Sequence, residues 1–584
     1  MFLALRSSRG KHAVGGLALL CVATIALGLG AAAARAASPG TLDPSFGSGG
    51  IAGSGANTRL FGIAVQSDGK LVAVGESVGS SPSLLLARFT PSGALDPSFG
   101  SGGIVHGPAI PPSAGSLGRG VAVQSDGKIV VVGNATDSSG NYAQGLIVER
   151  YNSSGSLDTS FGSHGVVEQL GGTSFGQGYA VAIQPDGKII ATGSGNAAGS
   201  GGTFPRVAVV RLNANGSLDT SFQGGGVDVI DLGAFSYALA VALQPGGAIV
   251  IAGSQAPGLQ VPNALIARLT PSGALDTTFA GTGAYAHQYA QGASNSAFNA
   301  VAVQPDGKIV AAGAATIGNT SADALVVRFT ASGAQDGSFG SGGVVYTPSA
   351  NSYSANGGAV PGANGITIAP NGDIVAAGVY DNSVQTYATV WALTAGGALD
   401  GSFGSHGVSL YTNSAGNNTE YAAIGLSPSN GDFVAVGDGG PPFSGSYIGM
   451  AARYIGFGAP KPPPLKLSLK GLSKSYKTST VAKKGLKLTV GCNQPCTITA
   501  SLTVSAATAR KLHLKVHGNK PVTIATAKVT LKAAGSKSIT LKLSKGVAKA
   551  LEKQKSVGLT LRLSSTATAT RKTQTVTKGV TFKR

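Results

Sequence analysis

Two cysteines and two histidines near the C-terminus have types and spacing that could hold a metal ion. Cys492 and Cys496 flank Asn-Gln-Pro, and His513 and His517 follow after a gap of sixteen residues. Two Cys and two His form zinc fingers, but this gap exceeds their usual range and residues 512–517 alternate like a strand. Close cysteine pairs in exported chains usually form disulfides. We therefore expect a Cys492–Cys496 disulfide and assign no metal site, with a nucleic-acid-binding finger as the disfavoured alternative.

An aspartate recurs seven times in the phrase Leu-Asp-x-Ser-Phe-Gly, which could indicate acid–base or metal chemistry. A catalytic side chain is needed once, whereas a structural one is needed in every repeat. We interpret the aspartates as turn caps, paired with an arginine seven or eight positions earlier, and the phenylalanines as wedges between neighbouring units. These residues are Asp43, Phe46, Asp96, Phe99, Asp158, Phe161, Asp219, Phe222, Asp276, Phe279, Asp336, Phe339, Asp400 and Phe403.

The remaining reactive side chains form no recognisable catalytic set. His106 and His287 are isolated, while His164 and His406 occupy one phrase position where other copies carry glycine, as turn variants would. The chain has no nucleophile elbow, phosphate-binding loop or His-Glu zinc motif. We therefore assign no catalytic or cofactor-binding residue and expect no cofactor.

The elements that carry these residues form a repeat. The Leu-Asp phrases begin 53 to 64 residues apart and alternate with a second phrase, Gln-x-Asp-Gly-Lys. In one unit, residues 121–132 predict a hairpin around an Asp-Gly turn, and 146–151 and 165–167 predict two further strands. Seven four-stranded sheets stacked radially bury the faces that one sheet leaves open. The sequence predicts a seven-bladed β-propeller over residues 38–458, and the coils of the alternative, a parallel β-helix, are far shorter than these repeats.

Composition agrees with an all-β fold. The chain has 584 residues, of which 90 are glycine and 11% are charged, and 42% are hydrophobic. The hydrophobic share argues against disorder, glycine without a three-residue period excludes collagen, and so much glycine disfavours a mainly helical protein. The paired phrases resemble the delta-60 repeat family. That resemblance implies a β-propeller, and it implies no activity because the family has none established.

The turns between the phrases vary in length and sequence. Successive turns of an up-and-down sheet fall at alternate ends, so the repeated phrases share one end of the ring and the variable turns share the other. Variation on one face of a repeat scaffold is typical of a binding surface. Tyrosines cluster in or beside these turns and suit contact with glycan or protein. The candidate aromatics are Tyr285, Tyr289, Tyr353, Tyr380, Tyr387, Tyr411 and Tyr447.

The two ends of the chain differ from the repeats. Residues 1–37 have basic residues, an apolar stretch and the small-x-small site Ala34-Arg35-Ala36, which predict a cleaved export signal, with an uncleaved anchor as the alternative. Residues 459–466 predict a proline-rich linker. Beyond Pro460 there are 26 Lys or Arg and one acidic residue, Glu552. Alternating strands over 467–584 predict a small, basic antiparallel sandwich similar to immunoglobulin-like modules, with a short helix from Ser544.

These features favour a secreted or cell-surface binding protein that is not an enzyme. Its propeller face would engage a glycan or protein, and its basic module would associate with anionic envelope polymers. We expect no transmembrane span in the mature chain. The alternative is an extracellular propeller enzyme, a lyase or hydrolase acting on glycans. An enzyme should show a cluster of acidic residues or histidines in only one or two blades.

Overall fold

The computed structural model describes residues 38–79, 82–108, 115–136, 145–169, 176–195, 204–232, 235–256, 261–289, 295–317, 321–347, 362–381, 385–413, 418–428, 430–440, 447–458, 466–493, 495–531, 535–567 and 573–584. The predicted export signal and most of the predicted linker lie outside them. The chain forms two compact units, with the main boundary after Gly456. No helix of the described part is long and apolar enough to cross a bilayer.

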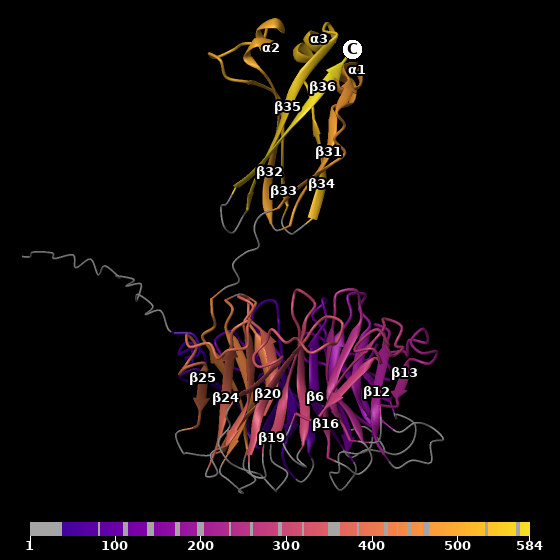
Figure 1. The fold of residues 1–584 in the computed structure, drawn as a ribbon, viewed down its shortest axis with the longest axis vertical. Helices are drawn as coiled ribbons and strands as arrows, with labels where there is room; N and C mark the ends of the chain where they lie inside the picture. Colours follow the sequence, from indigo (N-terminus) through magenta and orange to yellow (C-terminus); the bar gives the residue numbers. More distant parts are fainter. Residues whose placement is uncertain are drawn as a thin grey trace, which may run out of the picture. The chain divides into compact units, whose positions relative to one another are not determined.

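The first unit is a propeller of seven four-stranded antiparallel sheets, which confirms the predicted fold class (Figure 1). Blades 1 to 3 consist of β2 (Thr58–Val65), β3 (Leu71–Ser77), β4 (Ser83–Phe89) and β5 (Ile104–His106); β6 (Gly115–Val123), β7 (Ile129–Thr136), β8 (Leu146–Tyr151) and β9 (Val166–Gln169); and β10 (Gln177–Ile183), β11 (Ile189–Gly195), β12 (Arg206–Leu212) and β13 (Val227–Ile230).

Blades 4 to 7 repeat this order. They consist of β14 (Ser236–Leu243), β15 (Ile249–Gln255), β16 (Asn263–Leu269) and β17 (Ala284–His287); β18 (Ser296–Val303), β19 (Ile309–Ile317), β20 (Ser321–Phe329) and β21 (Val344–Thr347); β22 (Gly362–Ile368), β23 (Ile374–Asp381), β24 (Thr386–Leu393) and β25 (Val408–Tyr411); and β26 (Asn418–Leu426), β27 (Phe433–Gly440), β28 (Ile448–Tyr454) and β1 (Ile51–Ala56).

The ring is closed by the N-terminal strand. β1 pairs antiparallel with β28, Ile51 opposite Ala452, and so supplies the outermost strand of blade 7. The sequence between one Leu-Asp phrase and the next thus provides the last strand of one blade and the first three strands of the following blade. Because β1 completes blade 7, all seven blades have four strands and the edge of β28 is paired.

The middle strands of each blade form the core. In β8 every residue from Leu146 to Tyr151 is buried, and β3 and β27 are buried almost throughout. Both faces of a middle strand pack against neighbouring blades, so these strands are continuous apolar runs and do not alternate.

The hairpin turns position the first strands. In blade 2, Gly127 has a φ of +87°, which suits glycine, and the Asp126 carboxylate accepts a hydrogen bond from the Lys128 amide at 3.0 Å. The Leu-Asp-x-Ser-Phe-Gly phrase forms the turn between the third and fourth strands. Both phrases therefore lie at one end of the blades, and the connections between second and third strands lie at the other.

The second unit consists of two sheets and three helices (Figure 1). One sheet is ordered β29-β31-β34 and the other β30-β36-β35-β32-β33. The strands are β29 (Leu467–Lys470), β30 (Ser475–Lys477), β31 (Leu486–Cys492), β32 (Cys496–Val504), β33 (Val522–Leu531), β34 (Gly535–Leu541), β35 (Ser556–Ala567) and β36 (Thr573–Lys583), and the helices are α1 (Thr478–Lys484), α2 (Ala506–Lys511) and α3 (Lys545–Glu552).

Two expectations for this unit are wrong in detail. Residues 512–517 form no strand, because the chain leaves α2 there in a turn in which His513 has a φ of +53°. The sheets are not wholly antiparallel, since β30 and β36 pair in parallel. The predicted helix is present as α3, and the Ser544 side chain caps it by accepting a hydrogen bond from the Val547 amide at 3.3 Å. Similarity to immunoglobulin-like modules stays a prediction.

Candidate functional site

In six of the seven blades the repeated aspartate forms an ion pair with an arginine. In blade 2, Oδ2 of Asp158 accepts hydrogen bonds from Nε of Arg150 and Nζ of Lys128, both at 2.8 Å. Its Oδ1 caps the turn through the amide and hydroxyl of Ser160. The lysine comes from one phrase and the aspartate from the other, so the network joins both turns at that end of the blade. In blade 6, Ala392 replaces the arginine opposite Val375.

The same arginine and phenylalanine connect neighbouring blades. The Arg150 guanidinium lies 4.4 Å from the centre of the Phe161 ring and donates a hydrogen bond to the Ala214 carbonyl of blade 3. The Phe161 ring is fully buried, and a Cβ built on Gly216 of blade 3 would lie 2.9 Å from it. This geometry recurs around the ring, so these residues have a structural role.

The seven candidate tyrosines do not form one exposed surface. Tyr289 is only 6% exposed and donates a hydrogen bond to Gln335, so it packs within the propeller and is not a free binding aromatic. Tyr380 and Tyr387 form a cross-strand pair in blade 6 with ring centres 5.9 Å apart. Tyr285 packs at 5.8 Å on Phe329, Tyr411 is half-buried in β25, and Tyr353 lies outside the described residues.

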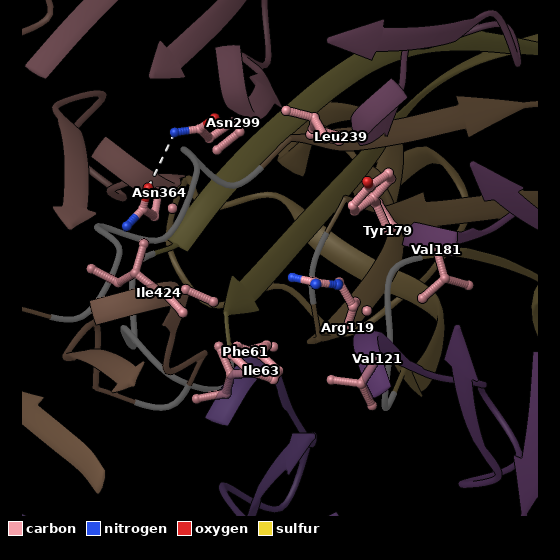
Figure 2. Close-up of a pocket in the computed structure, with 18 of the residues that line it drawn as sticks. Phe61, Ile63, Arg119, Val121, Tyr179, Val181, Leu239, Asn299, Asn364 and Ile424 are labelled. Atoms are coloured by element: carbon pink, nitrogen blue, oxygen red, sulfur yellow. Dashed lines mark hydrogen bonds between the residues drawn. The ribbon is translucent and has the colours of Figure 1, made fainter. Parts of the chain in front are cut away.

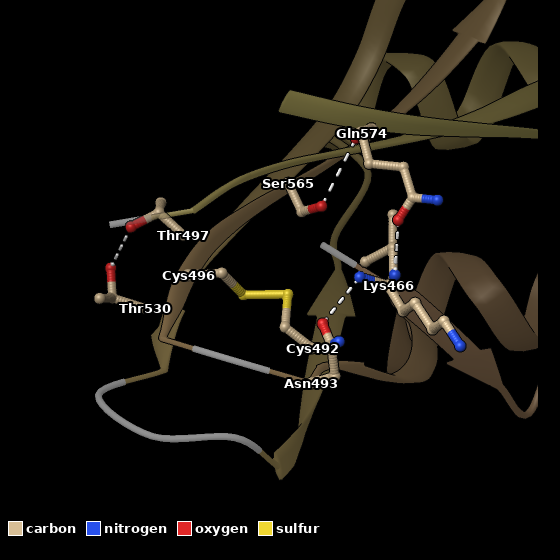
Figure 3. Close-up of a disulfide and its surroundings, with 9 residues drawn as sticks. Lys466, Cys492, Asn493, Cys496, Thr497, Thr530, Ser565 and Gln574 are labelled. Carbon is tan, nitrogen blue, oxygen red and sulfur yellow. Dashed lines mark hydrogen bonds between the residues drawn. A yellow bond between two sulfur atoms is a disulfide. The ribbon is translucent and has the colours of Figure 1, made fainter. Parts of the chain in front are cut away.

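Cys492 and Cys496 are joined in a disulfide (Figure 3). Cys492 ends β31 and Cys496 begins β32, so the bond links the two sheets of the second unit. Because both sulfur atoms are used, neither is a thiolate ligand for zinc. The described residues contain no cluster of three or more His, Cys, Asp or Glu that could bind a metal.

A cavity of about 620 Å³ lies on the propeller axis and is lined by the first strand of every blade (Figure 2). In six blades the first strand has a bulge at the same position, which frees one residue from strand pairing. The bulged residues and their blade 6 counterpart form a ring at the cavity wall: Phe61, Arg119, Tyr179, Leu239, Asn299, Asn364 and Ala422.

Two residues further along each first strand, the wall is entirely aliphatic. This second ring consists of Ile63, Val121, Val181, Val241, Val301, Ile366 and Ile424. It lies toward the end that carries the repeated phrases. The cavity is therefore apolar on that side and polar toward the end with the variable turns.

Four charged residues meet at the polar end, where blades 1 and 7 adjoin. Arg59 of β2 pairs with Asp438 at 3.2 Å, with Glu420 at 3.3 Å and with Glu76 at 3.9 Å. Its guanidinium also lies 4.7 Å from the centre of the Tyr447 ring. We call Arg59, Glu76, Glu420 and Asp438 the axial cluster.

The axial cluster is not part of the repeat. Arg59 pairs across the hairpin with Glu76, and Glu420 with Asp438. The same register in blades 2 to 5 holds Leu117 with Asn134, Gln177 with Ser194, Tyr237 with Ser254, and Ala297 with Ala314. Charge at this position is therefore confined to the two blades that close the ring.

The surroundings of Asp438 in the axial cluster favour its protonated form. Burial and the neighbouring Glu420 carboxylate raise the pKa of Asp438 to about 7, against the opposing effect of Arg59. Glu420 and Arg59 keep part of their side chains exposed, 21% and 25%. The cluster thus offers hydrogen-bond donors and acceptors to the cavity, beside the aromatic rings of Phe61 and Tyr447.

Sequence reasoning missed this cluster because Arg59, Glu420 and Asp438 are far apart in the chain. A signal was present: aligning the seven hairpins on their turns places Arg59, Leu117, Gln177, Tyr237, Ala297, Gly362 and Glu420 in one column. Of the tyrosines predicted from the sequence, Tyr447 contacts the axial cluster.

Comparisons with known proteins agree with the propeller. A family model described as "Domain of unknown function (DUF5122) beta-propeller" matches residues 66–99, 124–161, 184–222, 244–279 and 304–339. The matched segments each run from the hairpin phrase to the buried phenylalanine, so the matches fall on five of the seven repeats. The resemblance to the delta-60 repeat family stays a prediction. No curated protein matches the sequence.

Several solved structures are similar in fold at low identity. They include the polysaccharide lyase Uly1 (11% identity, TM-score 0.38, 68% of this chain and 89% of that one). A second is a Trypanosoma rangeli sialidase in complex with the inhibitor DANA (11% identity, TM-score 0.34, 89% of this chain and 84% of that one). A third is Sqt1 from Chaetomium thermophilum (11% identity, TM-score 0.33, 68% of this chain and 95% of that one). These similarities concern the fold alone.

Proposed function

We propose that this is a secreted or cell-surface binding protein whose propeller holds a glycan at the polar end of its axial cavity. The observation that carries the proposal is the axial cluster, which places charged groups at a register that is neutral in blades 2 to 5. The aromatic rings of Phe61 and Tyr447 lie beside it. Sugar hydroxyls accept from guanidinium and donate to carboxylates, and aromatic rings contact the apolar faces of sugars. A cavity of about 620 Å³ is within the usual range of small-ligand sites.

A glycan array with the full chain tests this proposal. We expect binding by the native protein and at least tenfold weaker binding by Arg59→Gln and Glu420→Gln, because each removes a charged hydrogen-bonding group. Arg206→Gln is the matched control, since Arg206 is a propeller arginine outside the cavity, paired with Asp231. Native-like affinity in both cluster variants, or binding of a protein partner in place of any glycan, would count against it.

We further propose that the basic second unit associates with anionic polymers of the cell envelope. Its three helices lie at one end of the two sheets (Figure 1), and their last turns carry Lys483, Lys484, Arg510, Lys511 and Lys549. Such a concentration of charge attracts polyanions through screened forces. None of the large hydrophobic side chains exposed in the described part belongs to this unit, which favours a polymer over insertion into a bilayer.

Retention of the full chain on immobilised polyphosphate tests the anionic association. We expect elution at moderate salt, and earlier elution when Lys483, Lys484, Arg510, Lys511 and Lys549 are all changed to glutamine. Retention that ignores salt, or no retention at low salt, would contradict it.

A second candidate function is an extracellular enzyme acting on glycans, favoured by one observation. Asp438, with its pKa raised to about 7, lies beside the Glu420 carboxylate, and a protonated acid beside a carboxylate is the pair that glycoside hydrolysis uses. Release of new reducing ends from a bound glycan, lost in Asp438→Asn, would support the enzyme. Binding without turnover would leave the binding role.

A further inference from the structure

A second arginine lies in the axial cavity, and it differs from Arg59 in its partners. Arg119 is the bulged residue of β6. Its guanidinium carbon lies 5.4 Å from the ring centre of Phe61 and 5.6 Å from that of Tyr179. Figure 2 shows the Arg119 side chain directed into the cavity. Phe61 and Tyr179 therefore hold the guanidinium in place by cation–π contacts.

No carboxylate in the described part of the chain neutralises Arg119. Its Nε atom is buried and has no hydrogen-bond partner, whereas the guanidinium of Arg59 pairs with three carboxylates. Glu76 and Glu420, the carboxylates that line the cavity, are both engaged with Arg59. The positive charge of Arg119 therefore has no counter-charge among the described residues, and an anionic group in the cavity would supply one.

The rest of the cavity wall suits a sugar ring beside that charge. Nδ2 of Asn299 donates to Oδ1 of Asn364 at 3.1 Å, and Nδ2 of Asn364 donates to the Tyr421 carbonyl at 3.1 Å, so both amides are fixed at the wall (Figure 2). The aliphatic ring of Ile63, Val121 and their counterparts lies next to them. Apolar walls lower the local dielectric and strengthen an ion pair formed there.

We propose that Arg119 makes this cavity specific for a saccharide that carries one anionic oxygen group, either a carboxylate or a sulfate ester. One uncompensated cation matches one negative charge, and the planar guanidinium presents paired donors to such a group. The inference rests on the proposed glycan-binding function and adds the charge of the ligand. In this arrangement the anionic group contacts Arg119, while the neutral hydroxyls face the amides and the axial cluster.

Matched saccharides that differ only in charge test the proposal on the full chain. The first pair is a galactotriose analogue in which one sugar is galacturonate, and the methyl ester of that analogue. The second pair is galactotriose with a single 6-O-sulfate and unmodified galactotriose. Isothermal titration of the native protein should show at least tenfold tighter binding of the acidic member of one pair, and the pair that responds identifies carboxylate or sulfate. Arg119→Gln should abolish the preference for the acidic member, while Arg206→Gln should keep it.

The outcomes separate this inference from the proposed function. Equal binding of acidic and neutral members, or a preference that survives Arg119→Gln, overturns the role of Arg119 and leaves glycan binding intact. Absence of binding to all four saccharides and to the glycan array overturns both. If circular dichroism shows that Arg119→Gln does not fold, Arg119→Lys decides: its point charge should reduce the preference several-fold, and an unchanged preference would refute the proposal.

Discussion

Nε of Arg453 donates a hydrogen bond to Oδ2 of Asp43 at 2.7 Å, although the two residues are 410 positions apart in the chain. In blade 2 the equivalent bond joins Arg150 to Asp158, only eight positions away. Blade 7 therefore has the same arginine–aspartate contact as the other arginine-bearing blades. Its two residues come from the first and last parts of the propeller sequence, so this contact helps to close the ring. Arg453 also donates to the Pro91 carbonyl of blade 1, so it connects the last blade to the first.

Loss of the closing ion pair should destabilise the whole propeller. We expect Asp43→Asn to lower its free energy of unfolding by about 3 kcal/mol, because it leaves Arg453 without its carboxylate. Asp336→Asn, which breaks the equivalent contact with Arg328 within blade 5, should cost a similar amount. Denaturant unfolding of the full chain measures both. A stable Asp43→Asn beside a weakened Asp336→Asn would show that β1 does not close the ring.

The repeated aspartates predict loss of propeller stability in acid. Burial alone would raise the pKa of Asp158, but hydrogen bonds from Lys128 and Ser160 and the charge of Arg150 outweigh it and hold the pKa well below its usual value. The same holds for Asp96, Asp219 and Asp336. Their stabilisation is complete above the unfolded pKa of about 4 and falls as these carboxylates are protonated below it. Unfolding curves between pH 2 and pH 6 should show this decline, and a flat profile would contradict it.

The buried Glu149 carboxyl should make the stability of the propeller fall as the pH rises, which is the opposite of the effect of the repeated aspartates. Burial raises its pKa from 4.5 to about 7, against hydrogen bonds from Tyr151 and Ser116. Stability should therefore fall as the pH rises from about 4.5 to 7, by about 3 kcal/mol, and then level off. Glu149→Gln keeps a neutral acceptor, so it should remove this fall and be more stable than the native protein at pH 8. Equal stability of the two proteins at pH 8 would refute the prediction.

The disulfide should stabilise only the second unit. It closes a short loop, with a sequence separation of four, so its expected contribution is about 2 kcal/mol, at the low end of the usual range. Changing both Cys492 and Cys496 to serine should lower the unfolding transition of the second unit and leave the propeller transition unchanged. Added zinc should not shift the native transitions. A zinc-dependent rise in melting temperature would instead support the metal alternative.

The repeat made most of the fold predictable from the sequence. The Asp-Gly turns and buried phenylalanines recur at fixed positions, so local pattern and global architecture agree. Closure by β1 was not predictable, because Ile51 and Ala452 carry no sign of their pairing. The second unit was less regular. Residues 512–517 alternate in hydropathy as a strand does, yet they follow the end of α2 and form no strand.

The candidate site was less predictable than the fold. Tyrosine density drew attention to the variable turns, but Tyr289 is buried and most of those turns lie outside the described residues. Arg59 and Arg119 belong to no sequence motif, and only the pairing of the first strands places them at the axial cavity. The candidate site lies in these departures from the repeat, which become visible once the register is known.

The most direct test of the account is a crystal structure of the full chain with a glycan identified on the array. We predict that the saccharide occupies the axial cavity, within hydrogen-bond distance of Arg59 or Glu420. A saccharide bound only at the turns of the repeated phrases, or only on the second unit, would contradict the account.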